Sequence, residues 1–196
     1  MSATTQSRPA DDTMGGRYTA VAQAFHWLVV LMLVVQYSVA LWLDAVLPKS
    51  AAGALVQWHF SLGSSVLVVM LLRLAWRLTH PPPPPPADLK PGLQLLSRVT
   101  HWTFYAVLIV LPVMGWFAAS AYGSQVRLAG LIPLPMPVPK DDPFGKLMQQ
   151  VHPAVAVTLL GVIALHVAGA LYHALVKRDG VLRRMLPGHQ PGPTRS

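Results

Sequence analysis

Apolar residues along this chain gather into four long blocks, which are separated by polar or proline-rich connections. The blocks cover residues 20–43, 54–76, 99–121 and 151–176. Each block is long enough for a transmembrane helix, which needs about 20 mostly apolar residues. The pattern therefore predicts an all-α integral membrane protein, built as a bundle of four transmembrane helices. A soluble bundle with unusually buried helices is the alternative interpretation.

The segments outside the blocks suggest how the chain is divided. We expect residues 1–16 to be a disordered tail, residues 17–186 the four-helix domain, and residues 187–196 a loose C-terminal tail. Six consecutive prolines, residues 81–86, favour a stiff polyproline II strap between the second and third helices. A ligand for a proline-reading domain is the alternative for that run.

Prolines also mark irregular backbone later in the chain. The connection 122–150 contains five of them and predicts a structured, non-helical cap, with a short helix starting near Asp142. Pro112 predicts a kink in the third helix. Pro153 follows His152 directly, so that either the fourth helix begins at Pro153, or a helix begun near Asp142 bends there.

Composition supports the membrane interpretation and removes several kinds of site. Only 11% of the 196 residues are charged and 53% are hydrophobic, whereas about a quarter of a soluble domain is charged. The chain has no cysteine. This absence excludes disulfides, thiolate metal sites, iron–sulfur clusters and covalently attached c-type haem.

Basic residues are distributed unevenly between the connections. Of the 15 Lys and Arg residues, four lie in the first and third connections: Lys49, Arg127, Lys140 and Lys146. The other eleven lie in the N-terminal segment, the second connection and the C-terminal segment, so the positive-inside rule places both termini in the cytoplasm. The net charge of +8 therefore indicates topology and attraction to anionic membrane lipid rather than binding to nucleic acid.

Six of the eight histidines lie within or at the edges of the apolar blocks: His26, His59, His101, His152, His166 and His173. The other two, His80 and His189, are expected to be solvated. Ionisable side chains at membrane depth are unfavourable, and they usually face the protein interior with a partner. One hydrogen bond to a neighbouring helix would satisfy a lone histidine, but six of them in four helices favour a shared role.

The predicted topology assigns four of these histidines to two levels. His26 and His166, the inner pair, lie toward the cytoplasmic side, and His59 and His152, the outer pair, lie toward the opposite side. The step of 14 residues between His152 and His166 corresponds to about 21 Å of helical rise and to about 40° less than four full turns. These two side chains therefore lie on nearly the same face of the fourth helix, one at each level.

Two imidazoles at each level favour axial ligation of a planar macrocycle. Neutral imidazole is the commonest protein metal ligand, and helical bundles hold cofactors from facing helices. A zinc or copper site would need three or four ligands at one level. Small residues near the histidines leave room for a large flat group: Gly63, Gly161, Ala164, Ala168 and Gly169. The residues thus predict two bis-histidine haems, with purely structural histidines as the alternative.

Four segments carry a family resemblance: RYTAVAQAFHWL (17–28), HFSLGSSVLVVMLLRLAWRLTHPPPP (59–84), LPVMGW (111–116) and LHVAGALYHALVKRDGVLRRMLPG (165–188). Together they resemble the bacterial cytochrome b561 family of four-helix, di-haem membrane cytochromes, which are also similar to hydrogenase b-type subunits. Each motif alone is weak, but four of them in this order and spacing are specific. The likeness covers nearly the whole chain.

The resemblance implies two haem b groups with His26, His59, His152 and His166 as axial ligands to iron, in a multi-pass protein of the bacterial inner membrane. It implies electron transfer between a periplasmic donor, either superoxide or a redox protein, and ubiquinone near the inner haem. Superoxide:ubiquinone oxidoreductase (superoxide oxidase) is one expected activity. A haem-bearing anchor that relays electrons for a separate dehydrogenase or hydrogenase is the alternative, and a haem-free transporter or scaffold is a third class.

Three further residues are candidates for contacts at the cytoplasmic side. His173 and Arg77 are candidates for quinone or haem-propionate contacts, although His173 could equally be a plain interfacial histidine and Arg77 a headgroup anchor. His101 is open between a hydrogen-bonding or propionate role and a structural one. No side chain is expected to act as a catalytic group, because the haem carries the redox chemistry.

Overall fold

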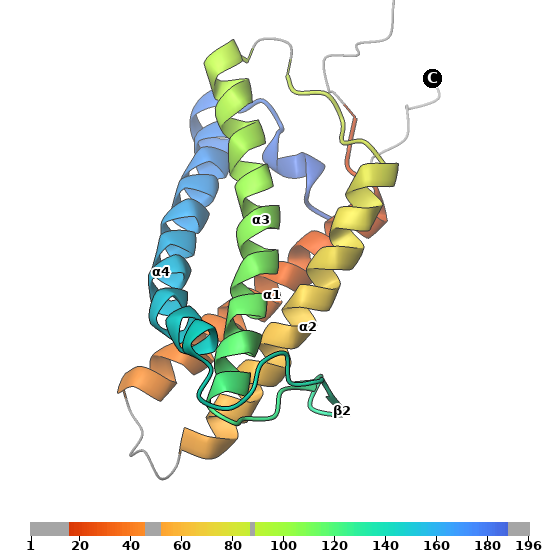
Figure 1. The fold of residues 1–196 in the computed structure, drawn as a ribbon. Coiled ribbons are helices and arrows are strands. Elements are labelled where there is room, and N and C mark those ends of the chain that lie inside the picture. Colours follow the sequence, from red (N-terminus) through yellow and green to blue (C-terminus); the bar gives the residue numbers. More distant parts are fainter. Residues whose placement is uncertain (1–15, 46–51, 87–88, 188–196) are drawn as a thin grey trace, which may run out of the picture.

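The computed structural model of the protein describes residues 16–45, 52–86 and 89–187. In chain order, its elements are helix α1 (Ala20–Ala45), helix α2 (Ala52–Thr79), helix α3 (Pro91–Ala121), the strands β1 (Arg127–Leu128) and β2 (Ile132–Pro133), helix α4 (Pro143–Tyr172), the π-helix η1 (His173–Lys177) and the 3₁₀-helix η2 (Leu182–Arg184) (Figure 1). The four α-helices are long and apolar enough to cross a membrane. The predicted four-helix membrane fold is therefore confirmed.

Two of the helices begin earlier than the apolar blocks predict. Helix α3 starts at Pro91 and α4 at Pro143, and in both a proline occupies the first turn, where its missing N–H has no intrahelical partner to lose. The Asp142 side chain caps α4 by accepting a hydrogen bond from Gly145 N at 3.0 Å. Hydropathy could not show these ends, because a proline in the first turn, joined in α4 by the Asp142 cap, marks them in place of apolar character.

The connection between α3 and α4 is consequently shorter than predicted: the helix expected to start near Asp142 is present, but it is not short, because it continues into the fourth transmembrane helix. Residues 143–150 are the first two turns of α4, and Pro153 lies inside that helix. Of the two alternatives for Pro153, a helix begun near Asp142 is the one observed. The first half of the connection forms the antiparallel β1–β2 hairpin, which packs on α2.

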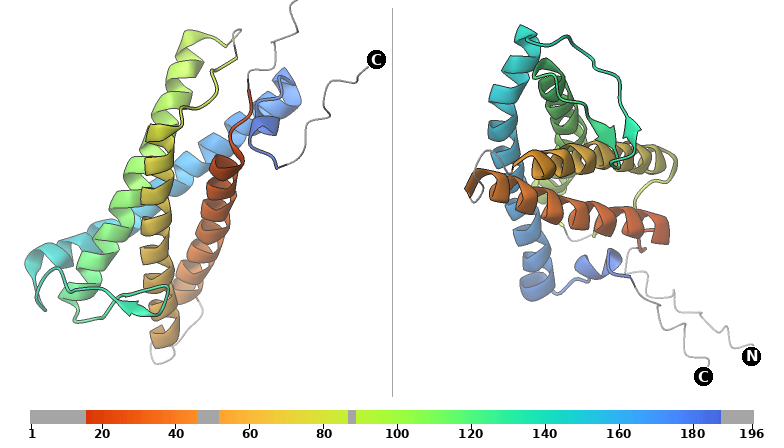
Figure 2. Two further views of the ribbon diagram at one scale, coloured as in Figure 1. Left: turned by 90° about the vertical axis from the view of Figure 1, so that its right-hand side faces the viewer. Right: turned by 90° about the horizontal axis from the view of Figure 1, so that it is seen from below.

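Sequential helices pack as antiparallel neighbours, α1 on α2, α2 on α3 and α3 on α4. The backbones of α1 and α4 approach each other less closely. A hydrogen bond from the Tyr37 hydroxyl to the Ala156 carbonyl, 2.7 Å long, bridges these two helices. The β1–β2 hairpin lies at one end of the bundle, here called the hairpin end, and both ends of the described chain lie at the other, the terminal end (Figure 2). The two ends of the described chain thus share one side, as predicted, and the assignment of that side to the cytoplasm stays a prediction.

The buried core is a thin apolar layer in the middle of the bundle. All four helices contribute to it: Val29 and Met32 from α1, Val66 and Met70 from α2, Tyr105 and Leu108 from α3, and Leu159 from α4. Leu159 and Met70 are completely buried. Leu159 lies seven residues from both His152 and His166, and seven residues are close to two helical turns. The apolar layer therefore separates the level of the inner pair from that of the outer pair.

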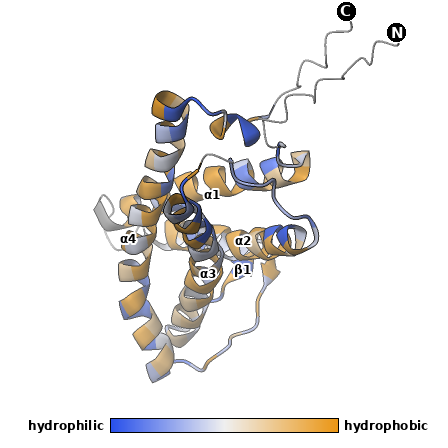
Figure 3. Cartoon of the chain, turned by 90° about the horizontal axis from the view of Figure 1, so that it is seen from above, coloured by the Kyte–Doolittle hydropathy of each residue, from blue (hydrophilic) through white to orange (hydrophobic). Residues whose placement is uncertain are grey.

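Much of the remaining apolar surface is exposed on the outside of the helices. Leu31, Val34 and Val157 are 62%, 60% and 68% exposed. In Figure 3 hydrophobic residues dominate the helices, and hydrophilic residues gather mainly near their ends and in the C-terminal segment. Apolar surface of this extent would be a liability in water, whereas it matches the hydrocarbon of a bilayer.

The terminal end is held by hydrogen bonds between segments that are far apart in sequence. Gln23 Nε2 donates to Arg184 O at 3.0 Å, and Trp27 Nε1 donates to Met185 O at 2.8 Å. The Arg184 guanidinium donates to Pro84 O at 2.7 Å and so attaches the proline run 81–86, which contains neither helix nor strand. This attachment favours the strap interpretation of the run. The predicted tails, residues 1–16 and 187–196, lie almost entirely outside the described residues.

Candidate functional site

The structure brings the four predicted ligand histidines together in the two predicted pairs. The ring centroids of His26 on α1 and His166 on α4 are 6.3 Å apart, with an angle of 64° between the ring planes. Those of His59 on α2 and His152 on α4 are 6.2 Å apart, with an angle of 70°. Helix α4 thus supplies one imidazole to each pair, as the spacing of its histidines predicts.

The separation of the rings fits one metal atom between each pair. An imidazole nitrogen binds a first-row transition metal at about 2.0 Å and the ring centroid lies about 1.1 Å behind it, so two rings on opposite sides of one metal have centroids about 6.2 Å apart. Both observed pairs match this value. Among the described residues, no group of three or more His, Asp or Glu side chains is arranged to hold a metal ion. The donor set therefore suits a bis-histidine haem and not a zinc site.

Two buried polar atoms without partners lie at the outer pair, one in His152 and one in the neighbouring Gln36. His152 Nδ1 and Gln36 Oε1 are both buried without a hydrogen-bond partner among the described residues. The Leu111 carbonyl lies near the His152 ring but does not meet hydrogen-bond geometry with Nδ1. Unpaired buried polar atoms are unfavourable and require an explanation, such as a redox role or a bound ion or water. They mark the outer pair as a place where a bound group completes the site.

Glycine keeps α3 close to the outer pair. A Cβ atom at Gly115 would lie 3.2 Å from His152 Cε1, a closer contact than side chains ordinarily make. The glycine therefore allows the imidazole to pack directly against the α3 backbone. Sequence reasoning singled out small residues on α2 and α4 but missed this one, although its place in the LPVMGW motif was a signal.

Cationic and aromatic side chains surround the inner pair. Arg73 Nη2 lies 3.4 Å from His26 Nδ1, and the Arg73 guanidinium stands over the Tyr105 ring, 5.7 Å from its centroid. The His101 ring centroid is 5.5 Å from that of His166. This distance is shorter than the separation of about 6.2 Å expected for two rings that bind one metal. His101 is therefore a neighbour of the inner pair and not one of its two ligand candidates.

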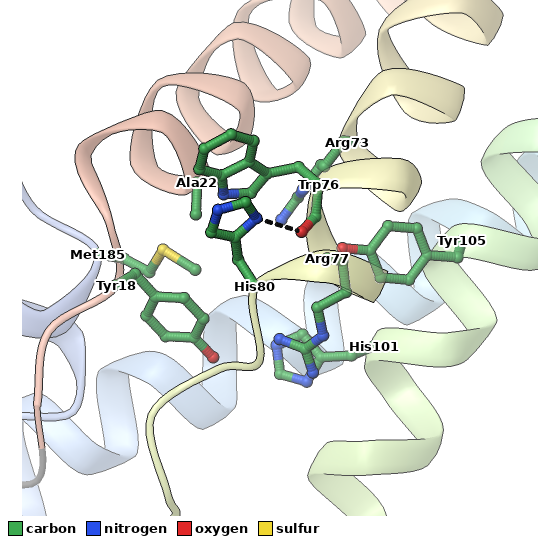
Figure 4. Close-up of a pocket in the computed structure, with 9 residues that line it drawn as sticks. All are labelled: Tyr18, Ala22, Arg73, Trp76, Arg77, His80, His101, Tyr105 and Met185. Carbon is green, nitrogen blue, oxygen red and sulfur yellow. Dashed lines mark hydrogen bonds between the residues drawn. The ribbon is translucent and has the colours of Figure 1, made fainter.

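A small pocket opens beside the inner pair at the terminal end (Figure 4). Its lining comes from α1, α2 and α3, from the residues just before α1 and just after α2, and from the C-terminal segment: Tyr18, Ala22, Arg73, Trp76, Arg77, His80, His101, Tyr105 and Met185. Two of these residues are arginines, and none of the described lining residues is acidic. His80 is exposed, as expected, and stacks on Trp76 with 3.7 Å between ring centroids. The pocket therefore suits an anionic or hydrogen-bond-accepting group.

The two candidates for quinone or haem-propionate contacts, Arg77 and His173, have different surroundings. Arg77 lines the pocket, which agrees with a contact to a propionate or a quinone. His173 is outside that lining and lies in η1, where its Nδ1 donates to Asp179 Oδ2 at 2.5 Å. Burial raises the pKa of Asp179, but the hydrogen bonds from His173 and from the Val181 N–H outweigh it and hold this pKa below its ordinary value. Sequence reasoning missed Asp179 because the left-handed backbone at Arg178 turns the chain back toward His173.

Comparison with known proteins places the chain in a family. The family model described as prokaryotic cytochrome b561 matches residues 17–188. A protein from Yersinia pestis called "Probable superoxide oxidase CybB" is 31% identical over 174 residues, which are 89% of this chain and 98% of that protein. Two proteins of Escherichia coli (strain K12) are also similar. "Cytochrome b561 homolog 2" is 24% identical, over 87% of this chain and 91% of that protein, and "Cytochrome b561 homolog 1" is 27% identical, over 87% and 97%.

These matches run through all four helices and through both histidine pairs. Together with the four membrane-spanning helices, they establish a bacterial membrane oxidoreductase that binds haem b and transfers electrons. The chain belongs to the prokaryotic cytochrome b561 family.

Proposed function

We propose that the chain binds two haem b groups, one between His26 and His166 and the other between His59 and His152. The observation that carries this proposal is the separation of the ring centroids, 6.3 Å and 6.2 Å, which fits axial ligation of one iron in each pair. Haem supplies one-electron chemistry, and the protein supplies the ligands, the spacing and the apolar surroundings. The two pairs are about 21 Å apart along α4.

We further propose that electrons pass from superoxide at the hairpin end to ubiquinone at the terminal end. Each superoxide gives up one electron and leaves as O₂, and two electrons with two protons convert the quinone to the quinol. The name of the Yersinia pestis relative supports superoxide as donor. The pocket at the terminal end supports a quinone site, because Arg77 and His101 line it and could donate hydrogen bonds to a carbonyl oxygen.

Side chains of this chain have separable roles in that reaction. The four imidazoles hold the cofactors, and the layer around Leu159 excludes water between them. At the hairpin end, Lys146 is paired with Asp141 at 2.8 Å, so the local excess of positive charge is small. Attraction of the superoxide anion is therefore expected to be weak and sensitive to salt.

The topology completes the proposal. With the basic terminal end in the cytoplasm, the chain is a multi-pass protein of the inner membrane and its hairpin end faces the periplasm.

A haem-bearing anchor for a separate dehydrogenase or hydrogenase is the second candidate. Exposed apolar residues of the hairpin, Leu131 at 77% and Ile132 at 60%, favour it, because they offer a surface to a partner protein.

Two measurements test these proposals. A dithionite-reduced minus oxidised spectrum of the purified protein should show b-type haem, with two haems per chain by pyridine haemochrome assay. The purified protein alone should then reduce a soluble quinone analogue when superoxide is generated enzymatically. A protein that contains both haems but stays inactive without a partner would be the anchor. A protein without a haem spectrum would contradict the haem ligation and, with it, both candidate functions.

A further inference from the structure

Twelve consecutive residues in the β1–β2 hairpin and the loop after it carry no polar side chain. They are residues 128–139, LAGLIPLPMPVP, here called the apolar segment. Three of its side chains are strongly exposed, Leu131 at 77%, Ile132 at 60% and Met136 at 47%. An exposed apolar run of this length is unfavourable in water, so we expect another apolar surface to cover it.

The backbone N–H groups of the apolar segment are mostly absent or paired. Every second residue from position 133 to position 139 is a proline, which has no N–H group. Four of the remaining N–H groups donate hydrogen bonds within the protein, those of Gly130, Leu131, Leu134 and Val138. The segment therefore needs little water to satisfy its backbone donors.

Side chains at the end of α3 and in the connection pair carbonyl groups of the same segment. Trp116 Nε1 donates to Pro135 O at 3.0 Å. The Ser120 hydroxyl donates to the Val138 carbonyl. Irregular backbone is tolerated near hydrocarbon only where its polar groups are satisfied by the protein. This segment meets that requirement to an extent that an ordinary water-exposed loop does not need.

The hairpin lies beside the membrane-spanning part of α2 and not beyond its end (Figure 1). A Cβ atom at Gly130 would lie 3.9 Å from Ser61 Oγ, and Ser64 Oγ donates to Arg127 O at 3.3 Å. Ser61 is about 12 Å from the start of the apolar span Gly53–Thr79. That span has 27 residues and is about 40 Å long, about 10 Å more than the hydrocarbon thickness. The hairpin tip is therefore close to the boundary between headgroups and acyl chains.

Two tryptophans and two basic residues accompany the apolar segment at the hairpin end. Trp58, three residues before Ser61, is 68% exposed, and Trp42, near the end of α1, is 57% exposed. Tryptophan is enriched where membranes meet water. Arg127 and Lys140 flank the segment and are exposed, and long basic side chains extend to the headgroup level. A phospholipid leaflet matches this order of groups, because it offers acyl chains to the segment and phosphates to the cations at its two ends.

We propose that the apolar segment is a lipid-binding element that enters the bilayer leaflet on the hairpin side. Leu131 and Ile132 contact acyl chains. Arg127 and Lys140 contact phosphate groups. The hairpin contacts α2 two to five residues after His59, so its lipid contacts hold the outer pair at a fixed depth below the membrane surface. This inference goes beyond the proposed electron transfer and does not depend on haem ligation.

Spin labelling of the purified full-length protein in nanodiscs of phosphatidylethanolamine and phosphatidylglycerol tests the proposal. Because the chain has no cysteine, one introduced cysteine carries the label without background. Ile132→Cys and Met136→Cys place the label in the apolar segment at two independent positions. Val157→Cys, at a side chain 68% exposed on α4, is the lipid reference. Lys90→Cys, an exposed position just before the span that begins at Pro91, is the water reference.

The measurement compares collisions of each label with oxygen, which concentrates among acyl chains, and with a water-soluble nickel complex. At both positions in the segment the oxygen-to-nickel ratio should exceed that of Lys90→Cys several-fold and approach that of Val157→Cys. A ratio equal to that of Lys90→Cys would overturn the proposal and leave the segment free for a partner protein, as the anchor function requires. Low access to both reagents would also overturn it, because it would show that a second copy of the chain covers the segment.

Discussion

Replacement of His26 by alanine is expected to remove the inner haem and to leave the outer haem in place. The haem content should fall from two per chain to one, because His26 and His166 are placed to bind one iron between them, with 6.3 Å between their centroids. The outer pair is about 21 Å away along α4, beyond the range of about 10 Å in which substitutions usually influence each other. The spectrum and the potential of the remaining haem should therefore equal those of the outer haem in the wild type.

His101 provides the matched control for this experiment. Its ring centroid is only 5.5 Å from that of His166, closer than His26, and its Nδ1 is 2.6 Å from Ser97 O. Its separation from His166 is about 0.7 Å too short for two rings on opposite sides of one metal. His101→Ala should thus retain both haems by pyridine haemochrome assay. Loss of a haem in His101→Ala together with retention of both in His26→Ala would refute the assignment from ring separation.

Three further substitutions test the surroundings of the pairs. Leu159→Ala should lower the free energy of unfolding by about 2 to 4 kcal/mol, because it opens a cavity in the fully buried layer, whereas Leu160→Ala on the exposed face should have little effect in detergent denaturation. Gly115→Ala places a Cβ 3.2 Å from His152 and should lower the outer haem content without changing the inner one. Asp179→Asn should lower the melting temperature at pH 7, because the pKa of Asp179 is depressed in the folded protein and its carboxylate is stabilising above its ordinary pKa. That difference should shrink as the pH falls below about 4, and a difference that stays constant with pH would contradict the ionic origin.

The sequence was sufficient to predict the helices and the histidine pairs, because both depend on periodic features. A run of about 20 apolar residues is readable without any contact information, and a 14-residue step on one helix returns to nearly the same face. The ends of α3 and α4 were not predictable in this way. Pro91 and the cap at Asp142 extend these helices through more polar residues, which a hydropathy pattern assigns to the connections.

Contacts between helices were beyond the sequence argument. Gln36 is an isolated amide within an apolar block, which indicates a buried partner but not which one. Its contact with His59 depends on the rotation of α1 against α2, and no pattern within a single helix specifies that rotation. Similarly, Arg73 is one of two arginines that could have anchored α2 at the headgroups, and only the packed bundle brings it to His26.

Helix α4 explains why two sites in one small bundle can differ in chemistry while keeping a fixed spacing. It gives one imidazole to each pair, so the distance between the sites is set by a single rigid element with Leu159 between them. The second imidazole of each pair comes from a different helix, α1 for the inner pair and α2 for the outer pair, and each brings its own neighbours. An amide then meets the outer ring and a guanidinium the inner ring. The spacing of the two pairs and the immediate surroundings of each pair therefore come from different residues, which allows one to change without the other.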